Sequence, residues 1–138
     1  MVEGQLEVLM ITSRLSRHWL IPKGWPMRGR DDADAAAREA YEEAGVKGVI
    51  SRAPIGRYRY EKLIPEKRPI PCWVDVFALE VDRELEKWPE AGERERKWMP
   101  LAEARLFAFE RGLAELLRTI EPAQAFESAS AGRRRKHR

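Results

Sequence analysis

Three glutamates have the type and spacing to do chemistry: Glu39, Glu42 and Glu43. On a helix they fall within an arc of about 100°. Glu39 and Glu43 then form a like-charged i,i+4 pair, which costs about 0.2–0.5 kcal/mol, and the C-terminal end of the helix dipole disfavours both. A divalent cation would remove this conflict, because Mg²⁺ and similar ions prefer oxygen ligands such as carboxylates. The spacing therefore indicates a metal site, and the alternative is a solvated acidic helix face.

The helix that must position these glutamates is predicted from about residue 32 to residue 44. Asp31 is a suitable N-cap, since its carboxylate can accept a hydrogen bond from the first turn. Alanine, the best helix former, dominates the body of the segment, and Gly45 suits the left-handed conformation that ends many helices. A stripe of small residues beside the glutamates is expected to pack on a sheet: Ala33, Ala37, Ala40 and Ala44.

Short apolar or alternating segments predict strands at residues 6–11, 19–21, 49–60, 72–81 and 93–99. The segment 72–81 is largely apolar on both faces, which predicts a central strand. A last helix is predicted where apolar residues recur at helical spacing: Leu106, Phe109, Leu113, Leu116, Leu117 and Ile120. Strands and helices in this order predict an α/β fold in which helices cover a mixed sheet.

The composition is that of one globular domain with a charged surface. Of 138 residues, 43% are hydrophobic and 36% are charged, and the length is too short for two ordinary domains. The sequence contains no run of eighteen apolar residues, so we predict no membrane partner. The single Cys72 cannot form an internal disulfide, which favours a cytoplasmic location. We interpret Cys72 as a small apolar strand residue.

The formal charge of +3 arises at the C-terminal end. Five of the residues 133–138 are basic, and without them the chain has 21 basic and 23 acidic residues. We therefore predict a near-neutral domain at residues 1–121 and a flexible basic tail at residues 122–138. Contact with nucleic acid is expected only through this tail, whose basic residues have no aromatic residue between them to stack on bases. The sequence does not indicate an oligomeric state.

The segment 24–46 resembles the Nudix box, the signature of a family of hydrolases. The box reads Gly, five residues, Glu, seven residues, then Arg-Glu-apolar-x-Glu-Glu-x-Gly-apolar. Here Gly24 is followed by five residues, Arg30, seven residues and the run 38–46, so only Arg30 departs from the box. The resemblance covers residues 4–121 and implies a Nudix-type α/β/α sandwich, with a mixed sheet, the box helix and a C-terminal helix. Nudix domains usually have a strand before residues 6–11, which here is either missing or upstream.

The resemblance implies a role for each box residue. Glu39, Glu43 and the carbonyl of Gly24 would bind Mg²⁺ or Mn²⁺, and Glu42 would be a further ligand or the general base. Arg38 would orient the glutamates by hydrogen bonding. The metal would make a water more acidic and a carboxylate would take its proton, so that a phosphoanhydride bond is hydrolysed.

The expected substrate is a polyphosphorylated small molecule. Ser13 and Arg14 match positions that hold phosphates in the diphosphoinositol polyphosphate phosphohydrolases, and the run 22–24 resembles the diadenosine tetraphosphate hydrolases. Cations suited to phosphate contacts lie near the box or on later strands: Arg14, Lys23, Arg28, Arg30 and Arg96, with Arg57, Arg59 and Arg94 as further candidates. Arg30 also replaces a glutamate that assists the metal site in many members, which leaves one metal position open.

The same residues are also consistent with other substrates and with one other function. Nucleoside triphosphates, nucleotide sugars and 5′-capped RNA are alternative substrates, and a Nudix-fold module that binds a phosphorylated ligand without turnover is the alternative function. Trp73, Trp88 and Trp98 are assigned to packing, whereas Trp25 would stack on a base or pack on the sheet edge.

Overall fold

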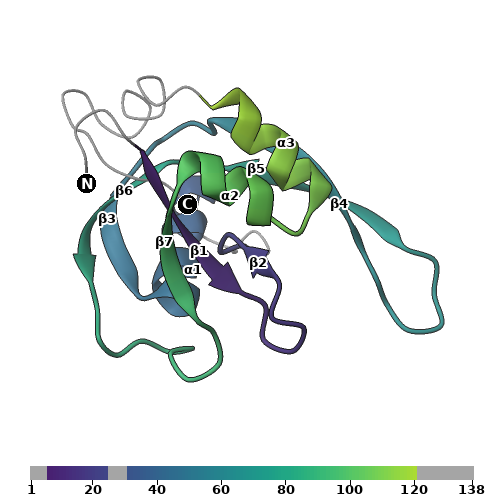
Figure 1. Cartoon of the computed structure of the whole chain (residues 1–138), viewed down its shortest axis with the longest axis horizontal. Helices are drawn as coiled ribbons and strands as arrows, with labels where there is room; N and C mark the ends of the chain where they lie inside the picture. Colours follow the sequence, from purple (N-terminus) through teal and green to yellow (C-terminus); the bar gives the residue numbers. More distant parts are fainter. Residues whose placement is uncertain (1–5, 25–30, 121–138) are drawn as a thin grey trace.

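The computed structural model describes residues 6–24 and 31–120, which form a layered domain. In chain order the elements are β1 (Glu7–Thr12), β2 (Trp19–Leu20), α1 (Asp32–Ala44), β3 (Val46–Ile50), β4 (Gly56–Lys62), β5 (Ile70–Val76), β6 (Leu79–Glu84), β7 (Arg96–Pro100), α2 (Leu101–Phe107) and α3 (Arg111–Thr119). Figure 1 shows α2 in front of β1, α3 beside α2 and over β4 and β5, and α1 behind β1 and β7. The predicted α/β sandwich is confirmed.

Strand β1 joins the two helical layers because both of its faces are apolar. Val8 and Met10 pack in one core cluster with residues of α2 and α3. Leu9 and Ile11 point to the opposite face, as alternation along a strand requires, and pack in a second cluster with alanines of α1. Full burial of a side chain of this size contributes about 1.5–3 kcal/mol. The apolar run at the N-terminus is therefore the central element of the fold.

The strands pair in antiparallel ladders. β1 lies between β2 and β7, with Ile11 opposite Leu20 and Leu9 opposite Trp98. β3 pairs with β6, and β4 pairs with β5. In the described residues, parallel pairing occurs as an isolated bridge between Trp19 and Ala108. In place of one mixed sheet, the described strands form antiparallel ladders in three sheets, and the parallel contact is confined to that bridge.

Helix α1 begins and ends at the residues predicted. A carboxylate oxygen of Asp31 accepts a hydrogen bond from the Asp34 N–H at 2.8 Å. Gly45 adopts the left-handed conformation, with φ 67° and ψ 37°, and its N–H donates to the Tyr41 carbonyl. A Cβ at position 45 would lie 2.4 Å from the ring of Trp88. Both the backbone conformation and the lack of space therefore require glycine here.

Two predicted strands are each split in two. The segment 49–60 divides into β3 and β4, and the segment 72–81 divides into β5 and β6. Ser51 holds Ala78 at the second division: its N–H donates to the Ala78 carbonyl at 2.8 Å, and its hydroxyl accepts from the Ala78 N–H at 3.0 Å. The prediction of a central strand is wrong. Its two apolar faces arise because β5 packs in the cluster of α2 and α3, while β6 packs in that of α1.

The predicted last helix is interrupted between α2 and α3. The Phe109 N–H donates to the Trp19 carbonyl at 3.0 Å, which draws the chain out of the helical path. Leu106 and Phe109 are consequently exposed, whereas Leu113 and Leu117 are buried as expected. Helical spacing continued through the interruption, so the sequence pattern alone did not reveal it.

None of the described helices is long and apolar enough to cross a membrane. Cys72 lies on β5 and is half-buried, in agreement with its assignment to a strand. The predicted tail at residues 122–138 lies outside the described residues.

Candidate active site

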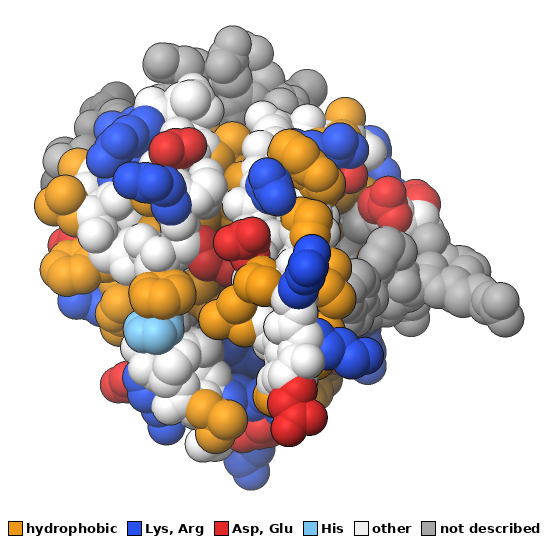
Figure 2. Space-filling model, turned by 90° about the vertical axis from the view of Figure 1, so that its right-hand side faces the viewer, with side chains coloured by type: hydrophobic (Ala, Val, Ile, Leu, Met, Phe, Trp, Pro, Cys, Tyr) orange, Lys and Arg blue, Asp and Glu red, His pale blue; other side chains and the backbone are white. Residues whose placement is uncertain are grey.

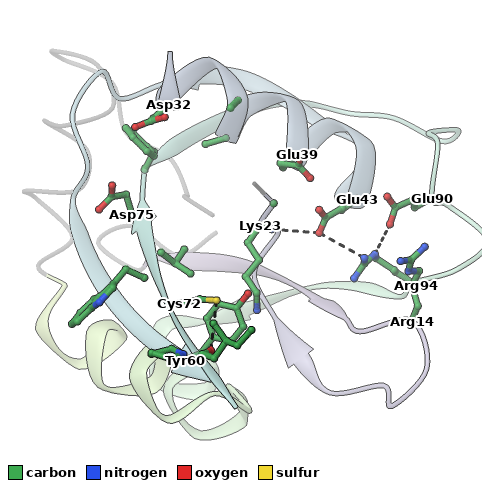
Figure 3. A pocket seen from close by; sticks show the side chains of 18 residues that line it. Arg14, Lys23, Asp32, Glu39, Glu43, Tyr60, Cys72, Asp75, Glu90 and Arg94 are labelled. Atoms are coloured by element: carbon green, nitrogen blue, oxygen red, sulfur yellow. Dashed lines mark hydrogen bonds and ion pairs between the residues drawn. The ribbon is translucent and has the colours of Figure 1, made fainter. Parts of the chain in front are cut away.

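A cleft of about 680 Å³ opens between α1 and the β4–β5 hairpin. Glu39 and Glu43 reach it from α1, Lys23 and Gly24 from the segment after β2, and Asp75 from β5 (Figure 3). Figure 2 shows acidic side chains in a hollow of one face, with basic and hydrophobic side chains around them. The fold therefore brings the three predicted metal ligands to one place.

Gly24 lies directly against the carboxyl group of Glu39. A Cβ at position 24 would lie 2.4 Å from the Glu39 Cδ and 2.5 Å from its Oε1. Any side chain at this position would push the carboxylate away from the segment after β2. The close approach explains why this position of the box is glycine.

Glu43 is a buried carboxyl group beside Glu39. The Lys23 N–H donates to its Oε1 at 3.4 Å. Burial is the largest cause that raises the pKa of Glu43, and a hydrogen bond with Glu39 and the charges of Glu39 and Glu90 raise it further. Arg94 opposes these effects, and the resulting pKa is about 8. The carboxyl pair therefore retains a proton at neutral pH in the absence of a cation.

The carboxyl pair fits a divalent cation. The raised pKa of Glu43 leaves a proton at the pair, and a cation there could replace that proton. In residues 6–24 and 31–120, groups of three or more Asp, Glu, His or Cys side chains placed to hold a metal are absent. Mg²⁺ commonly binds through one or two carboxylates and keeps several waters. Glu39 and Glu43 would hold the ion, with the backbone at Gly24 beside them.

Arg94 places a positive charge next to Glu43. Its Nη2 lies 3.8 Å from the Glu43 Oε1, and its Nε lies 2.7 Å from the Glu90 Oε1. Its Nη1 donates to the Thr12 carbonyl at 3.2 Å. Arg14 also lines the cleft and pairs with Glu93 at 3.2 Å. The sequence signal for Arg94 was the arginine-rich segment before β7, but the contact depends on how that segment folds back over β1.

Lys23 is held by Glu110, which sequence analysis did not single out. The Lys23 Nζ lies 2.7 Å from the Glu110 Oε2, and both side chains are mostly shielded from solvent. The Tyr58 hydroxyl donates to the Glu110 Oε1 at 2.9 Å. The Lys23 Nζ also lies 4.3 Å from the centroid of the Tyr60 ring. This network ties the segment that carries Gly24 to the start of α3.

Arg38 and Glu42 form an ion pair on the solvent side of α1. The Arg38 Nε lies 3.0 Å from the Glu42 Oε2, and both side chains are partly exposed. Neither residue is among the described residues that line the cleft. Arg38 is thus paired with Glu42, and the expected role of Glu42 as general base or further ligand stays a prediction.

Arg96 and Ser13, which were predicted to bind phosphate, form hydrogen bonds within the fold. Arg96 donates to the carbonyls of Ala44 and Gly45 at 2.9 and 3.1 Å and to that of Leu85 at 2.7 Å. It thus satisfies the C-terminal end of α1, where a cation is favourable. The Ser13 hydroxyl bonds to that of Ser16 at 2.7 Å and accepts from the His18 N–H at 2.9 Å within the turn after β1. Neither residue is among the described residues that line the cleft, and the phosphate contacts expected of them stay predictions.

Roles in the site were also predicted for Arg28, Arg30 and Trp25. These residues lie outside the described part of the chain. Of the tryptophans assigned to packing, Trp88 donates to the Glu43 carbonyl at 3.2 Å, and Trp98 packs against the core cluster of α1. The assignment of Trp73 was wrong, because its side chain is exposed and lines the cleft.

The chain is similar to known proteins over most of its length. A model of the NUDIX domain matches residues 1–120. Nudix hydrolase 12, mitochondrial, of Arabidopsis thaliana is 38% identical over 125 residues, which cover 86% of this chain and 62% of the relative. Nudix hydrolase 13, mitochondrial, of the same organism is 38% identical over 107 residues, which cover 74% and 53%. Human diphosphoinositol polyphosphate phosphohydrolase 3-alpha is 33% identical over 105 residues, which cover 74% and 60%.

The aligned part of the chain spans between about half and three fifths of the length of these relatives. The match of the domain model nevertheless extends over almost all of the residues that form the sandwich and its cleft. The chain belongs to the Nudix hydrolase family.

Proposed function

We propose that this chain is a Mg²⁺- or Mn²⁺-dependent hydrolase of phosphoanhydride bonds in dinucleoside polyphosphates or diphosphoinositol polyphosphates. The observation that carries the proposal is the carboxyl pair formed by the buried Glu43 and the half-buried Glu39, whose carboxyl group lies against the backbone of Gly24. The names of the relatives, which include a diphosphoinositol polyphosphate phosphohydrolase, support this class of reaction.

The chemistry divides between the ion and the protein. A bound divalent cation neutralises phosphate oxygens and makes a nearby water more acidic. Water adds its oxygen to one phosphorus, the bridging P–O bond breaks, and the other phosphate leaves with the bridging oxygen. The proton of the water passes to a carboxylate of the cleft. We assign this step to the one of Glu39 and Glu43 that is not bound to the ion, because Glu42 is bound to Arg38 outside the cleft lining.

Cations at the cleft would orient the phosphates. Arg14 is mostly exposed in its pair with Glu93, so it can turn toward a substrate at little cost. Arg94 and Lys23 line the cleft but are held by Glu90 and Glu110. We retain Arg28 and Arg30 as proposed phosphate contacts on the evidence of the sequence. A cytoplasmic location and contact of the basic tail with nucleic acid also remain predictions.

A panel of substrates with chromatographic detection of the products tests the proposal. Diadenosine polyphosphates, diphosphoinositol phosphates, nucleoside triphosphates, nucleotide sugars and capped RNA would each be incubated with Mg²⁺, Mn²⁺ or EDTA. We expect metal-dependent turnover of a substrate from the first two groups. Turnover in EDTA would contradict the proposal, and absence of turnover throughout the panel would favour the binding module.

A further inference from the structure

Glu110 is the N-cap residue of α3, but its side chain does not cap the helix. Ser, Thr, Asp and Asn are preferred at this position, because their short side chains can accept a hydrogen bond from the first turn. The Glu110 carboxylate instead accepts a hydrogen bond from the Tyr58 hydroxyl through Oε1 at 2.9 Å and pairs with the Lys23 ammonium through Oε2 at 2.7 Å. A residue that departs from a local preference often does so for function. Both oxygens of this carboxylate are bound to residues of other segments.

The start of α3 lies directly on β4, which fixes the position of this carboxylate. A Cβ at Gly112, two residues after Glu110, would lie 2.5 Å from the Arg59 carbonyl oxygen, so the helix backbone is almost in contact with the strand. The Tyr58 side chain is 3% exposed and packs in the core cluster of α2 and α3. Lys23 is therefore bound to a partner that packing holds in place.

The junction between α2 and α3 also holds the other end of the segment that leads to the cleft. The Trp19 carbonyl in β2 accepts a hydrogen bond from the Phe109 N–H at 3.0 Å. The neighbouring His18 ring stacks on the Phe109 ring, with 3.6 Å between the centroids. The segment from β2 to Lys23 is thus attached to this junction at both of its ends, and Glu110 makes the attachment nearer the cleft.

The end of this segment contacts both carboxyl groups of the proposed metal site. The Lys23 N–H donates to the Glu43 Oε1 at 3.4 Å, and the Gly24 backbone lies against the carboxyl group of Glu39. Figure 3 shows the Lys23 side chain extending from the backbone beside Glu43 toward Tyr60. A movement of Lys23 would therefore disturb the backbone beside both carboxyl groups.

On the basis of the proposed function, we infer that Glu110 is a positioning residue of the metal site. It holds Lys23, and thereby the backbone against which Glu39 and Glu43 are arranged to bind a divalent cation. Without the charge of Glu110, the shielded ammonium of Lys23 would turn to solvent or to the carboxylates of the cleft. The first movement carries the Lys23 N–H away from Glu43, and the second places a competing cation at the carboxyl pair. Either movement weakens metal binding, although Glu110 is not among the described residues that line the cleft.

Mn²⁺ binding to the full chain without substrate tests this inference. The decrease of the electron paramagnetic resonance signal of free Mn²⁺ gives the affinity, and circular dichroism verifies folding. We expect Glu110→Gln to weaken binding about 10-fold, the lower end of the range for residues that orient metal ligands. Tyr58→Phe removes one hydrogen bond of Glu110 but keeps the ring, and it should weaken binding by a smaller factor.

Glu103→Gln is the matched control. Glu103 pairs with Lys97 at 3.5 Å in a more exposed position on α2, and it is not among the described residues that line the cleft. This variant should leave the affinity for Mn²⁺ unchanged. Equal affinities of the wild type and Glu110→Gln would overturn the inference, as would an equal loss in Glu103→Gln.

A double-mutant cycle separates positioning from a loss of stability. Lys23→Met should weaken Mn²⁺ binding by a factor similar to that of Glu110→Gln, and the double variant should bind no more weakly than Lys23→Met alone. The Mg²⁺ concentration for half-maximal hydrolysis should rise in Glu110→Gln by the same factor as the Mn²⁺ dissociation constant, with a smaller effect on kcat at saturating Mg²⁺. A purely structural role would lower the amount of active protein and leave both metal constants unchanged. That result, or losses that add in the double variant, would overturn the inference.

The inference and the proposed function can fail separately. If Mn²⁺ binding depends on Glu110 and Lys23 in this way but no phosphoanhydride is hydrolysed, the positioning role stands and the proposed activity fails. If Mg²⁺-dependent hydrolysis occurs but the affinity for Mn²⁺ is independent of Glu110, the proposed activity stands and the positioning role is wrong.

Discussion

A carboxylate oxygen of Glu43 lies 3.8 Å from a guanidinium nitrogen of Arg94, and both side chains are largely buried. Arg94 is fixed independently by Glu90 and by the Thr12 carbonyl, so its charge is a constant feature of the site. It lowers the pKa of Glu43 but does not overcome the effects of burial and of Glu39. The metal-free site therefore remains short of positive charge, which is the condition that a divalent cation would relieve.

Substitution of Glu43 should affect catalysis far more than substitution of Glu42. We expect Glu43→Gln to lower kcat/KM about 10²–10⁴-fold, the range for a positioned acid–base group, because Glu43 lies in the cleft beside Glu39. Glu42→Gln should cost less than about 10-fold, since an exposed pair with Arg38 contributes little. Initial rates at saturating Mg²⁺ measure both effects, with circular dichroism to verify folding. Equal losses would return Glu42 to the general-base role that the resemblance implied.

The stability of the metal-free protein should decrease as pH rises from about 5 to about 8. The pKa of Glu43 is raised on folding from its ordinary value of 4.5 to about 8. The folded protein thus holds a proton that the unfolded chain releases, and this stabilisation is complete below the unfolded pKa and lost as pH rises through the folded pKa. Thermal unfolding in EDTA should show a smaller decrease for Glu43→Gln, which has no such proton. A parallel decrease in both proteins would contradict the assignment.

The contact between Lys23 and Glu110 should contribute measurably to stability. Glu110→Gln is expected to destabilise the protein by about 1–3 kcal/mol, because it leaves a shielded ammonium group without its charged partner. Glu103→Gln is the control, since Glu103 pairs with Lys97 at 3.5 Å in a more exposed position and should cost about 0–1 kcal/mol. Urea unfolding measures both, and a loss for Glu110→Gln no larger than that for the control would show that the network is dispensable.

Arg96 should act on the fold and not on phosphate binding. Arg96→Lys loses the planar group that donates to two carbonyls at the end of α1 and to that of Leu85 and lies over the Trp88 ring, so we expect a loss of about 1–3 kcal/mol. In folded protein well below its Tm, KM should change little. Denaturant unfolding and steady-state kinetics together make the test: an unchanged stability with a raised KM would restore the phosphate contact predicted from the sequence.

Local sequence signals predicted the helix α1 almost completely. Asp31 and Gly45 occupy the cap positions expected from their own chemistry, because capping depends on a few neighbouring backbone groups. The carboxyl pair followed from helix geometry for the same reason. Family membership followed from the spacing of the box and is confirmed by the domain match.

Contacts between distant segments were not predictable in this way. The arginine beside Glu43 depends on how the segment before β7 folds over Thr12, so the sequence did not show that Arg94 lies there while Arg96 binds carbonyls at the end of α1. The strand division at Ala78 depends on a hydrogen bond with Ser51, 27 residues away, and no turn residue marks it in the sequence. Glu110 gave no signal because its partner Lys23 is 87 residues away.

The most direct test of the central claim is the Mg²⁺ dependence of phosphoanhydride hydrolysis by the wild type and Glu43→Gln in parallel. Product release from diadenosine tetraphosphate would be followed while Mg²⁺ is titrated into each metal-free protein. We predict saturable Mg²⁺-dependent turnover by the wild type, none in EDTA, and a loss of at least about 10²-fold in the variant. Turnover that is independent of Mg²⁺, or near-normal Mg²⁺-dependent turnover by Glu43→Gln, would contradict the account.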